Sequence, residues 1–415
     1  MGELSEHMQS SNTPSLHGFA RAYTTKTPVV MFLAKAFHTD PRPRQEARSL
    51  IENNYRVYVL AWSRECCFKT TENVDGSFVR TFHGVKTADK SRALLALGAL
   101  VFQVFLVLES VRLIIRIRER PIIHAHDFNT LLPGCLLRML GLCTSLIYDC
   151  HEFSFAAYSE LFNNFTADLI RTIEEVAIRY TDAVVTVSDP IARYLRRFNP
   201  VTETIYNCPR ASEVPIISKK EARVRLGLPA DAFIVSQVGT IRYDSKLDLL
   251  LAVAKLVKSE NIHFVVVGGG PLAREFGQAA TETAREVQLT VLSQVPREKA
   301  LLYVSASDLT WVIYAQSENA RMTFPWKFFE SMACGVPMIV ERGTLRAAFV
   351  EKRRCGLVAE SDNPAEISRL IFTLASKPHR HQEMADAAKL AGREFAWEAM
   401  SSKLINLYAQ TPSRG

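Results

Sequence analysis

Two successive series of short apolar runs, each run followed by a helix-length segment, constrain this chain more than any other feature of its sequence. The first series lies between Val29 and Asn207 and contains VVMFLA, YRVYVLAW, PIIHAHD, SLIYDCHE, DAVVTVS and ETIYN. Short apolar runs of this kind predict buried strands. Strands that alternate with helices predict a parallel sheet covered by helices.

A segment rich in Pro, Ser and charged residues, 208–232, separates this series from a second one. The second series contains FIVSQVGT, IHFVVVGGGP, LTVLSQV, LTWVIY, PMIVE and CGLVAE. We therefore predict an α/β fold of two Rossmann-like, doubly wound parallel-sheet domains, with a ligand cleft at the carboxyl ends of the strands. The expected parts are a flexible leader (1–27), an N-terminal domain (28–207), a C-terminal domain (208–395), and a last helix and tail (396–415) that pack back on the N-terminal domain.

Composition agrees with a globular protein of two domains. Of 415 residues, 48% are hydrophobic and 22% are charged, which excludes a disordered chain. The net charge of +7 suits anionic ligands, but the basic residues form no clustered face, so we expect no nucleic acid partner. The eight cysteines form no CxxC pair, which predicts free thiols in a cytoplasmic protein rather than a zinc site.

One apolar segment, ALLALGALVFQVFLVL at 93–108, leaves two interpretations open. It continues into ESVRLIIRIRER, which carries four arginines, at positions 112, 116, 118 and 120. Its sixteen residues fall short of the roughly 20 that span a bilayer. The segment is either a long crossover helix buried against the sheet, or a helix that lies in a membrane interface, so that residues 93–120 make peripheral contact with anionic lipid on the inner face of the membrane.

The run PWKFFESMACGVP holds a candidate ligand site. On a helix that begins near Pro325, Lys327 and Glu330 stand three residues apart and share a face. A helix start favours phosphate, and a carboxylate can accept hydrogen bonds from two neighbouring hydroxyls, such as those of a ribose. The plainer alternative is a surface ion pair.

Polar residues also follow two strands of the first series. His124 and His126 alternate at the end of a strand and so share a face, with His124 expected to lie deeper. Asp127 is expected to cap the next helix. In YDCHEF, alternation places Asp149 and His151 on one side of the strand, and Glu152 on the other.

The glycines of VVVGGGP, at 268–270, could be mistaken for a dinucleotide fingerprint. They do not follow the first strand of a unit in the spacing GxGxxG, and no acid stands about 20 residues on in the required context. We predict a tight turn that permits close approach of another backbone segment.

Taken in order, the motifs resemble those of the retaining GT-B glycosyltransferases of glycosyltransferase family 4. The run P-x-K-x-F-E-x-M-A-C-G-x-P resembles the family's donor-site signature. Other segments also resemble the family, from about residue 28 to 410: RPRQEARSLIENNYRVYVLAW, IIHAHDFNTLLPG, LIYDCHEF, GTIRYDSKLDLLLAVAKL, FVVVGGGP and REFAWEAMSSKLINLY.

The resemblance implies an enzyme that moves a sugar from a nucleotide diphosphate sugar, held by the C-terminal domain, to an acceptor hydroxyl held by the N-terminal domain. Glu330 would bind the ribose, and Arg242 and Lys246 would stabilise the departing diphosphate. The implied catalytic residues are His126, Lys246 and Glu330. The implied donor-binding residues are Gly239, Thr240, Arg242, Lys246, Phe324, Lys327 and Glu330. The implied acceptor-side residues are Asp127, His151 and Glu152.

The chain departs from the family pattern at three places. Arg242 stands three positions after Gly239, whereas in much of the family the Arg directly follows the glycine, and Leu247 stands where a Gly normally follows the Lys. Met322 replaces an acid that contacts sugar hydroxyls in many members. Backbone N–H groups of 321–324, or Asn319, would then hold the sugar.

The resemblance also implies retention of configuration with no metal and no cofactor besides the donor. We expect front-face displacement, in which the departing phosphate accepts the proton of the acceptor hydroxyl. If the segment 93–120 contacts membrane, a lipid-linked sugar or glycolipid becomes the expected acceptor. Two alternatives are a GT-B nucleotide-sugar epimerase and a non-catalytic GT-B module that binds nucleotide sugar.

Overall fold

The computed structural model describes residues 26–63, 70–83, 92–153, 159, 163–257, 261–360 and 363–411. By its packing the chain divides into one compact unit that ends at Leu146 and a second that spans Ile147–Pro412. Residues 1–25 of the predicted leader lie outside the described residues, and its last two, Lys26 and Thr27, belong to the first strand instead. The domain boundaries expected from the sequence stay a prediction.

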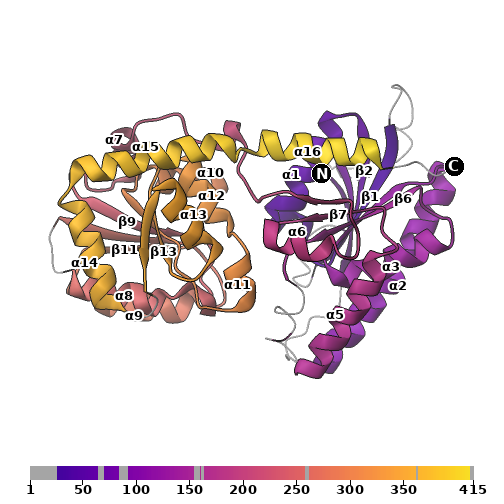
Figure 1. Cartoon of the computed structure of the whole chain (residues 1–415), viewed down its shortest axis with the longest axis horizontal. Helices are drawn as coiled ribbons and strands as arrows, with labels where there is room; N and C mark the ends of the chain where they lie inside the picture. Colours follow the sequence, from indigo (N-terminus) through magenta and orange to yellow (C-terminus); the bar gives the residue numbers. More distant parts are fainter. Residues whose placement is uncertain are drawn as a thin grey trace, which may run out of the picture. The chain divides into compact units, whose positions relative to one another are not determined.

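An eight-stranded sheet forms from the first series of apolar runs, in the order β3-β4-β2-β1-β5-β6-β7-β8 (Figure 1). Its strands are β1 (Lys26–Leu33), β2 (Tyr55–Ser63), β3 (Thr71–Val74), β4 (Ser77–His83), β5 (Ile122–His126), β6 (Ser145–Cys150), β7 (Ala183–Thr186) and β8 (Thr202–Thr204). The pairs β1–β2, β1–β5, β6–β7 and β7–β8 are parallel, as predicted, and β2–β4 is parallel as well.

The hairpin of β3 and β4 is the part of this sheet that the sequence analysis missed. It is antiparallel and places β3 at the edge. Asp75 and Gly76 form its turn with φ values of 51° and 86°. An Asp-Gly pair between two short runs is a strong hairpin signal, so this element could have been predicted.

The helices of this first part are α1 (Pro41–Glu52), α2 (Arg92–Ile117), α3 (Phe128–Met139), α5 (Asn164–Ile178) and α6 (Asp189–Leu195), with a 3₁₀ turn η2 (Phe37–Thr39). The Asp40 side chain accepts a hydrogen bond from Arg42 N and so caps α1. Asn163 caps α5 in the same way.

A second, six-stranded sheet has the order β11-β10-β9-β12-β13-β14. Its strands are β9 (Phe233–Val238), β10 (Ile262–Val267), β11 (Leu289–Leu292), β12 (Leu309–Trp311), β13 (Met338–Glu341) and β14 (Gly356–Ala359). Every pair is parallel, as predicted. The order along the chain reverses between β9 and β12, and in open α/β sheets ligands bind where the order reverses, at the carboxyl ends of the strands.

Helices cover both faces of the second sheet (Figure 1). On one face α8 (Leu247–Leu256), α9 (Ala273–Thr283) and α14 (Pro364–Ala375) bury residues such as Leu250, Ala280 and Ile371 against the strands. On the other face α10 (Arg297–Ser305) contributes Tyr303 and Val304. The remaining elements are η3 (Ala211–Glu213), α7 (Lys219–Leu226), η4 (Tyr243–Ser245), α11 (Glu318–Met322), α12 (Trp326–Ala333), α13 (Leu345–Arg353), α15 (Pro378–Glu394) and α16 (Trp397–Gln410).

The last helix, α16, contacts residues of the first series of strands. Lys403 donates to Glu203 of β8 over 3.0 Å, and Trp397 N donates to Pro209 O. These contacts fasten α16 beside β8.

Helix α2 differs from the buried crossover helix that was one of the two interpretations. Phe102 and Leu106 are fully buried, but Leu97, Leu100, Val104 and Leu108 are exposed. The exposed residues stand three or four apart and therefore form one apolar stripe. By length and composition alone, the 21-residue segment Leu97–Ile117 is also long and apolar enough to cross a membrane. Only 22% of its most apolar stretch is buried.

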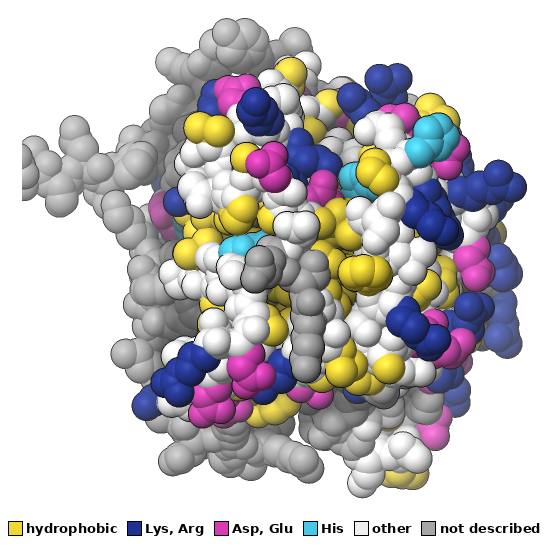
Figure 2. Space-filling view, turned by 90° about the vertical axis from the view of Figure 1, so that its left-hand side faces the viewer, with side chains coloured by type: hydrophobic (Ala, Val, Ile, Leu, Met, Phe, Trp, Pro, Cys, Tyr) yellow, Lys and Arg dark blue, Asp and Glu magenta, His cyan; other side chains and the backbone are white. Residues whose placement is uncertain are grey.

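Figure 2 shows the face of the molecule that lies on the left-hand side of Figure 1. Apolar side chains gather toward the middle of this face, and Lys and Arg lie mainly toward one rim with Asp and Glu among them. This face therefore presents mixed charge rather than a continuous basic surface.

The turn after β10 requires glycine at position 268. A Cβ there would lie 1.9 Å from the Gly239 carbonyl oxygen, whereas a Cβ at Gly277, inside α9, would meet nothing within 4 Å. We expect Gly268→Ala to lower the free energy of unfolding by about 1–3 kcal/mol or more. Gly277→Ala should instead raise it by about 0.5–1 kcal/mol, because alanine favours the helix.

Calorimetric melting of both variants checks this expectation. A Gly268→Ala protein that melts at the wild-type temperature would contradict the close contact between the two turns.

Candidate functional site

Two turns meet where the order of the second sheet reverses. Gly239 follows β9 with φ 134°, and Ile241 N donates to Gly269 O over 2.8 Å. The turn 268–270 after β10 therefore packs against the turn after β9, which is the close backbone approach predicted from the three glycines. Ala315 N, beyond β12, donates to Asp244 O over 2.8 Å and ties the third strand end to the same place.

Lys327 points at this junction from α12, which begins at Trp326 as predicted. Its Cε lies 3.5 Å from the point that a Cβ atom would occupy on Gly239. Its ammonium lies 5.0 Å from the centre of the Tyr314 ring. Burial lowers the pKa of Lys327 to about 8, against the opposing influence of Asp244 and Glu330. A partly buried cation beside backbone turns and a helix start can bind an anion such as a diphosphate.

Glu330 lies one turn further along α12 and is paired. Its Oε1 accepts from Arg297 Nη1 over 2.7 Å, and its side chain is 12% exposed. The plainer alternative, an ion pair of Glu330 with Lys327, is therefore not observed, and Glu330 pairs with Arg297. Arg297 was not among the predicted site residues. A cation in the first turn of a helix is unfavourable beside the helix dipole, which signals that its charge is compensated by another residue.

The other predicted donor residues lie in the turn after β9. Arg242 is exposed and binds both Asp244 oxygens, at 3.1 and 2.6 Å, so it forms a surface ion pair. Thr240 is exposed as well. Lys246 adopts the left-handed conformation, with φ 47°, immediately before α8. Leu247 is then the first residue of α8 and is buried, so the backbone needs no glycine there.

Hydrogen bonds from Arg346 hold the backbone on both sides of Met322. The Arg346 guanidinium donates to Ala320 O and Thr323 O and pairs with Glu341. Phe324 is buried in a cluster of aromatic rings that includes Phe328 and Phe349, so its side chain serves the core.

Asn319 was one candidate for holding a sugar in place of the missing acid. Its Oδ1 accepts a hydrogen bond from Phe153 N over 3.1 Å. Ligand binding through that oxygen would have to compete with this bond.

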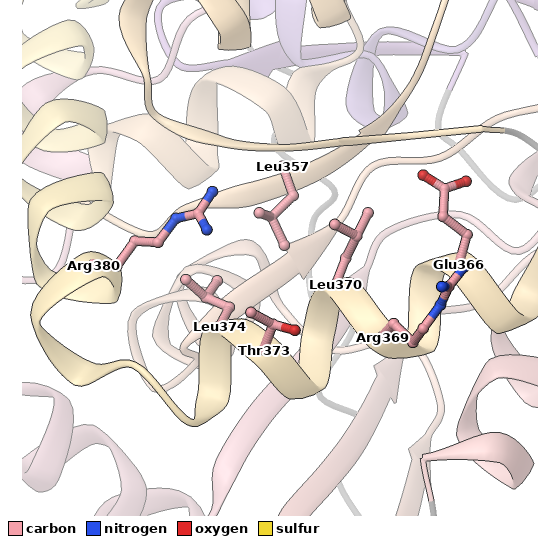
Figure 3. Close-up of a pocket in the computed structure, with 7 residues that line it drawn as sticks. All are labelled: Leu357, Glu366, Arg369, Leu370, Thr373, Leu374 and Arg380. Carbon is pink, nitrogen blue, oxygen red and sulfur yellow. The ribbon is translucent and has the colours of Figure 1, made fainter.

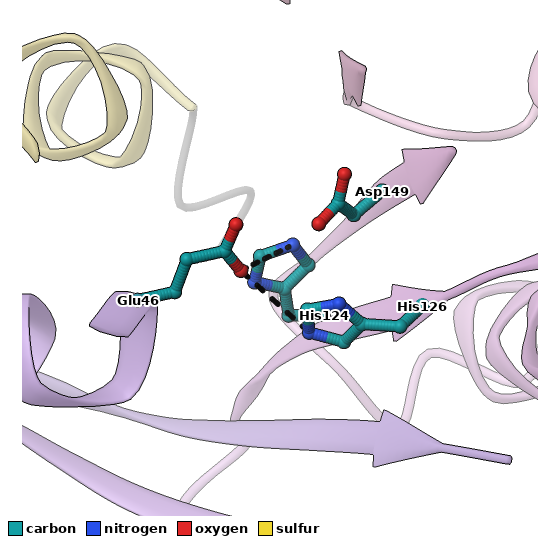
Figure 4. Close-up of side chains that lie close together, drawn as sticks. All are labelled: Glu46, His124, His126 and Asp149. Carbon is teal, nitrogen blue, oxygen red and sulfur yellow. Dashed lines mark ion pairs between the residues drawn. The ribbon is translucent and has the colours of Figure 1, made fainter. Parts of the chain in front are cut away.

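The two histidines of β5 lie together with Glu46 of α1 (Figure 4). Their rings stack with centroids 4.3 Å apart, which confirms that they share a face. Both are buried, with 0% and 1% of their surface exposed. The expectation that His124 lies deeper than His126 is therefore not met. Glu46 Oε2 lies 4.0 Å from His124 Nε2 and 3.8 Å from His126 Nε2. Arg42, one turn before Glu46, pairs with its other oxygen at 3.2 Å.

Asp127 does not cap α3 through its side chain, contrary to the prediction. It occupies the N-cap position with φ 63° and ψ 162°, and its carboxylate lies 3.9 Å from Lys35 Nζ. The hydroxyl of Thr130 instead donates to the carbonyls of His126 and Asp127. Such a backbone conformation is sparsely populated in residues other than glycine and is often found at functional sites.

The segment after β6 behaves as alternation predicts. His151 Nε2 lies 2.9 Å from Asp149 Oδ2, while Glu152 is exposed. Asp149 itself is fully buried.

Glu46, His124, His126 and Asp149 offer four ligand atoms within 4.8 Å of one another, and these residue types can bind a divalent metal. Both carboxylates, however, have partners from the protein: Arg42 for Glu46 and His151 for Asp149. The charge of Glu46 is therefore compensated by Arg42 without an ion, and Asp149 has a hydrogen-bond partner in His151.

A separate hollow of about 400 Å³ lies along α14, lined by Leu357, Leu370, Leu374 and Arg380 among others (Figure 3). None of the predicted site residues lines it. We assign it no part in the chemistry.

Two family models match this chain. Residues 44–208 match "Glycosyltransferase Family 4" and residues 218–391 match "Glycosyl transferases group 1". The two matches follow the predicted division of the chain into two α/β parts.

Curated relatives include the D-inositol 3-phosphate glycosyltransferases of Thermomonospora curvata and Xylanimonas cellulosilytica. The first is 32% identical over 200 residues, which are 45% of this chain and 45% of the relative. The second is 25% identical over 256 residues, which are 58% and 60% of the two chains. The matches thus span about half the length of these relatives.

Solved structures show the same fold over nearly the whole chain. Sucrose-phosphate synthase from Thermosynechococcus elongatus has a TM-score of 0.74 at 19% identity and covers 93% of this chain and 99% of its own. Anabaena HepE in complex with UDP-glucose has a TM-score of 0.66 at 14% identity and covers 92% and 99%.

The lowered pKa of Lys327 predicts a pH dependence of stability. Between pH 8 and 10.5, the ordinary pKa of lysine, the unfolded chain binds a proton at this residue that the folded protein has released. Stability from this residue therefore rises with pH in that window, and below pH 8 the buried charge destabilises the fold.

Lys327→Met should melt at a higher temperature than wild type at pH 7, and the difference should shrink as the pH rises from 8 to 10.5. Paired melting curves across this range check the expectation. A difference that grew with pH would contradict a lowered pKa.

Proposed function

The chain belongs to glycosyltransferase family 4 and has the GT-B fold, and from this premise we propose that it transfers a sugar from a nucleotide diphosphate sugar to an acceptor hydroxyl. The observation that carries the proposal is the convergence of the Gly239 turn, Lys327 and Glu330 where the strand order reverses. That arrangement suits a nucleoside diphosphate: backbone N–H groups and a cation for phosphate, and a carboxylate for ribose hydroxyls. The epimerase and non-catalytic alternatives are not favoured, since curated relatives are glycosyltransferases.

In this proposal Lys327 has the larger share of stabilising the leaving diphosphate. Cleavage of the sugar–phosphate bond builds negative charge on the departing oxygen, and a preorganised cation stabilises that charge more in the transition state than in the ground state. Lys246 assists from the start of α8. Arg242 must exchange its bonds to Asp244 for bonds to phosphate, so its part is smaller.

The proposed mechanism retains the configuration at the anomeric carbon. The acceptor oxygen bonds to that carbon on the face from which the phosphate departs, the carbon–phosphate oxygen bond breaks, and the acceptor proton passes to the departing phosphate. His126 stabilises charge and positions groups on the acceptor side, together with Asp127, His151 and Glu152. No metal takes part, which is supported by the pairing of Glu46 with Arg42 and of Asp149 with His151.

Variants of two histidines test the transfer. Incubation of the protein with UDP-, GDP- and ADP-sugars and a panel of sugar and glycolipid acceptors should yield a glycoside of unchanged anomeric configuration, read by NMR. His126→Ala should lower its rate about 100-fold or more. His379→Ala should leave it unchanged, because the side chain of His379 is 91% exposed on α15.

Full activity of His126→Ala would remove this residue from the mechanism. Conversion of the nucleotide sugar with no acceptor present would instead show an epimerase.

The proposed acceptor is carried by a membrane, on its inner face, and α2 makes the contact. The apolar stripe from Leu97 to Leu108 continues into exposed arginines at 112 and 116, as in helices that lie in a membrane interface. Beside them a hollow of about 180 Å³ is lined by Tyr58, Arg80 and Arg116 among others. Glu109 also lines it and pairs with Arg80 and Arg112, so an anionic head group would bind there mainly through Arg116.

Exposed leucines of α2 allow this contact to be tested without disturbing the core. Leu100→Gln/Leu108→Gln should reduce binding to vesicles containing phosphatidylglycerol roughly tenfold or more, because apolar area no longer leaves water. The control Leu256→Gln/Leu390→Gln changes two leucines that are equally exposed elsewhere, at 51% and 60%, and should bind as wild type does. Leu106 must be kept, since it is fully buried.

Equal vesicle binding by the α2 variant and wild type would contradict the proposed contact. Co-sedimentation of folded protein with vesicles measures it.

A further inference from the structure

Arg297 joins two carboxylates that lie far apart in the sequence. Besides its bond to Glu330, its Nε and Nη2 each lie 3.1 Å from Glu213 Oε2. Glu213 belongs to η3, in the segment between the two series of strands. The guanidinium also lies over the ring of Trp326, with its central carbon 5.1 Å from the ring centre.

These contacts hold Arg297 in one orientation. Burial alone would lower its pKa, but Glu330 and Glu213 raise it, so the guanidinium stays charged. Its planar group has nitrogens for both carboxylates at once, which a lysine ammonium at one point could not match. The first turn of α10 is otherwise an unfavourable place for a cation, because the positive end of the helix dipole lies there.

Glu330 is left with an oxygen for a ligand. Arg297 contacts Oε1, and no contact of Oε2 occurs among the residues that the structure describes. A carboxylate held through one oxygen presents the other in a fixed direction.

We propose that Arg297 is a positioning residue for the ribose of the donor: anchored by Glu213 and Trp326, it orients Glu330 so that its carboxylate accepts both ribose hydroxyls. This inference rests on the proposed function. Arg297 acts through Glu330 and does not touch the diphosphate. Its loss therefore weakens the binding of nucleotides that carry ribose hydroxyls and spares nucleotides that lack them.

Calorimetric titration with UDP, GDP and ADP, each beside its 2′,3′-dideoxy counterpart, distinguishes this role from a purely structural one. For the ribose-containing nucleotide that wild type binds, Arg297→Ala should lower the affinity about tenfold. For the dideoxy counterpart it should lower the affinity less than twofold. Arg297→Lys should lie between, since it keeps the charge but not the planar pair of contacts. In a Glu330→Gln background, Arg297→Ala should have no further effect.

The matched control is Arg353→Ala. Arg353 is likewise 34% exposed, pairs with both oxygens of Glu394 at 2.8 and 2.6 Å, and lies 5.7 Å from the Phe349 ring centre. It belongs to α13, and its loss should leave both affinities unchanged. This control separates the loss of an ion pair in general from the loss of this one.

Equal weakening of ribose and dideoxy nucleotides by Arg297→Ala would overturn the proposal, and so would equal binding by this variant and wild type. If Arg297→Ala fails to fold, Arg297→Lys carries the same comparison. A wild-type protein that binds none of the nucleotides would overturn the proposed function and this inference with it. A ribose-dependent loss in Glu330→Gln without one in Arg297→Ala would overturn this inference alone.

Discussion

The contact between two turns, Gly239 after β9 and Gly268 after β10, is the constraint on which the proposed donor site depends. With any other residue at 268, a Cβ would lie 1.9 Å from the Gly239 carbonyl oxygen, so the turns could not meet. Lys327 of α12 lies beside Gly239, and the Ala315–Asp244 bond brings the end of β12 to the same place. Lys327 is buried there, which lowers its pKa, and its ammonium lies beside the two turns that we propose bind a diphosphate.

Charge compensation organises both groups of polar residues. At the donor site Arg297 is shared by Glu213 and Glu330, and Arg346 by Glu341 and two backbone carbonyls. Beside the first sheet, Arg42 of α1 pairs with Glu46, whose other carboxylate oxygen lies near the stacked rings of His124 and His126. Buried charges without partners would be strongly unfavourable, so each of these carboxylates is paired with an arginine that compensates its charge.

The two parallel sheets could be predicted because most of their buried strands are short apolar runs in the sequence. Helix α12 could be predicted because Pro325 precedes a helical pattern. The sequence also placed His124 with His126, and Asp149 with His151, since alternation along a strand is local. It failed where partners come from distant segments: nothing near Glu330 reveals Arg297, 33 residues earlier, and nothing near His126 reveals Glu46. Asp127 was expected to cap α3, but its unusual backbone conformation directs the side chain elsewhere. The Asp75–Gly76 hairpin is different, because its signal was present and was not used.

The central claim is that the junction of Gly239, Lys327 and Glu330 holds a nucleoside diphosphate. A ligand that binds only the folded protein raises its melting temperature by mass action, in proportion to the logarithm of its concentration above the dissociation constant. The most direct measurement is therefore a melting series with UDP, GDP and ADP at increasing concentration, with the corresponding nucleosides as references. We expect at least one diphosphate to leave the melting temperature unchanged below its dissociation constant and to raise it steadily with the logarithm of its concentration above that point. Its nucleoside should cause no rise. If none of the diphosphates raised the melting temperature of the folded protein, the claim would be contradicted.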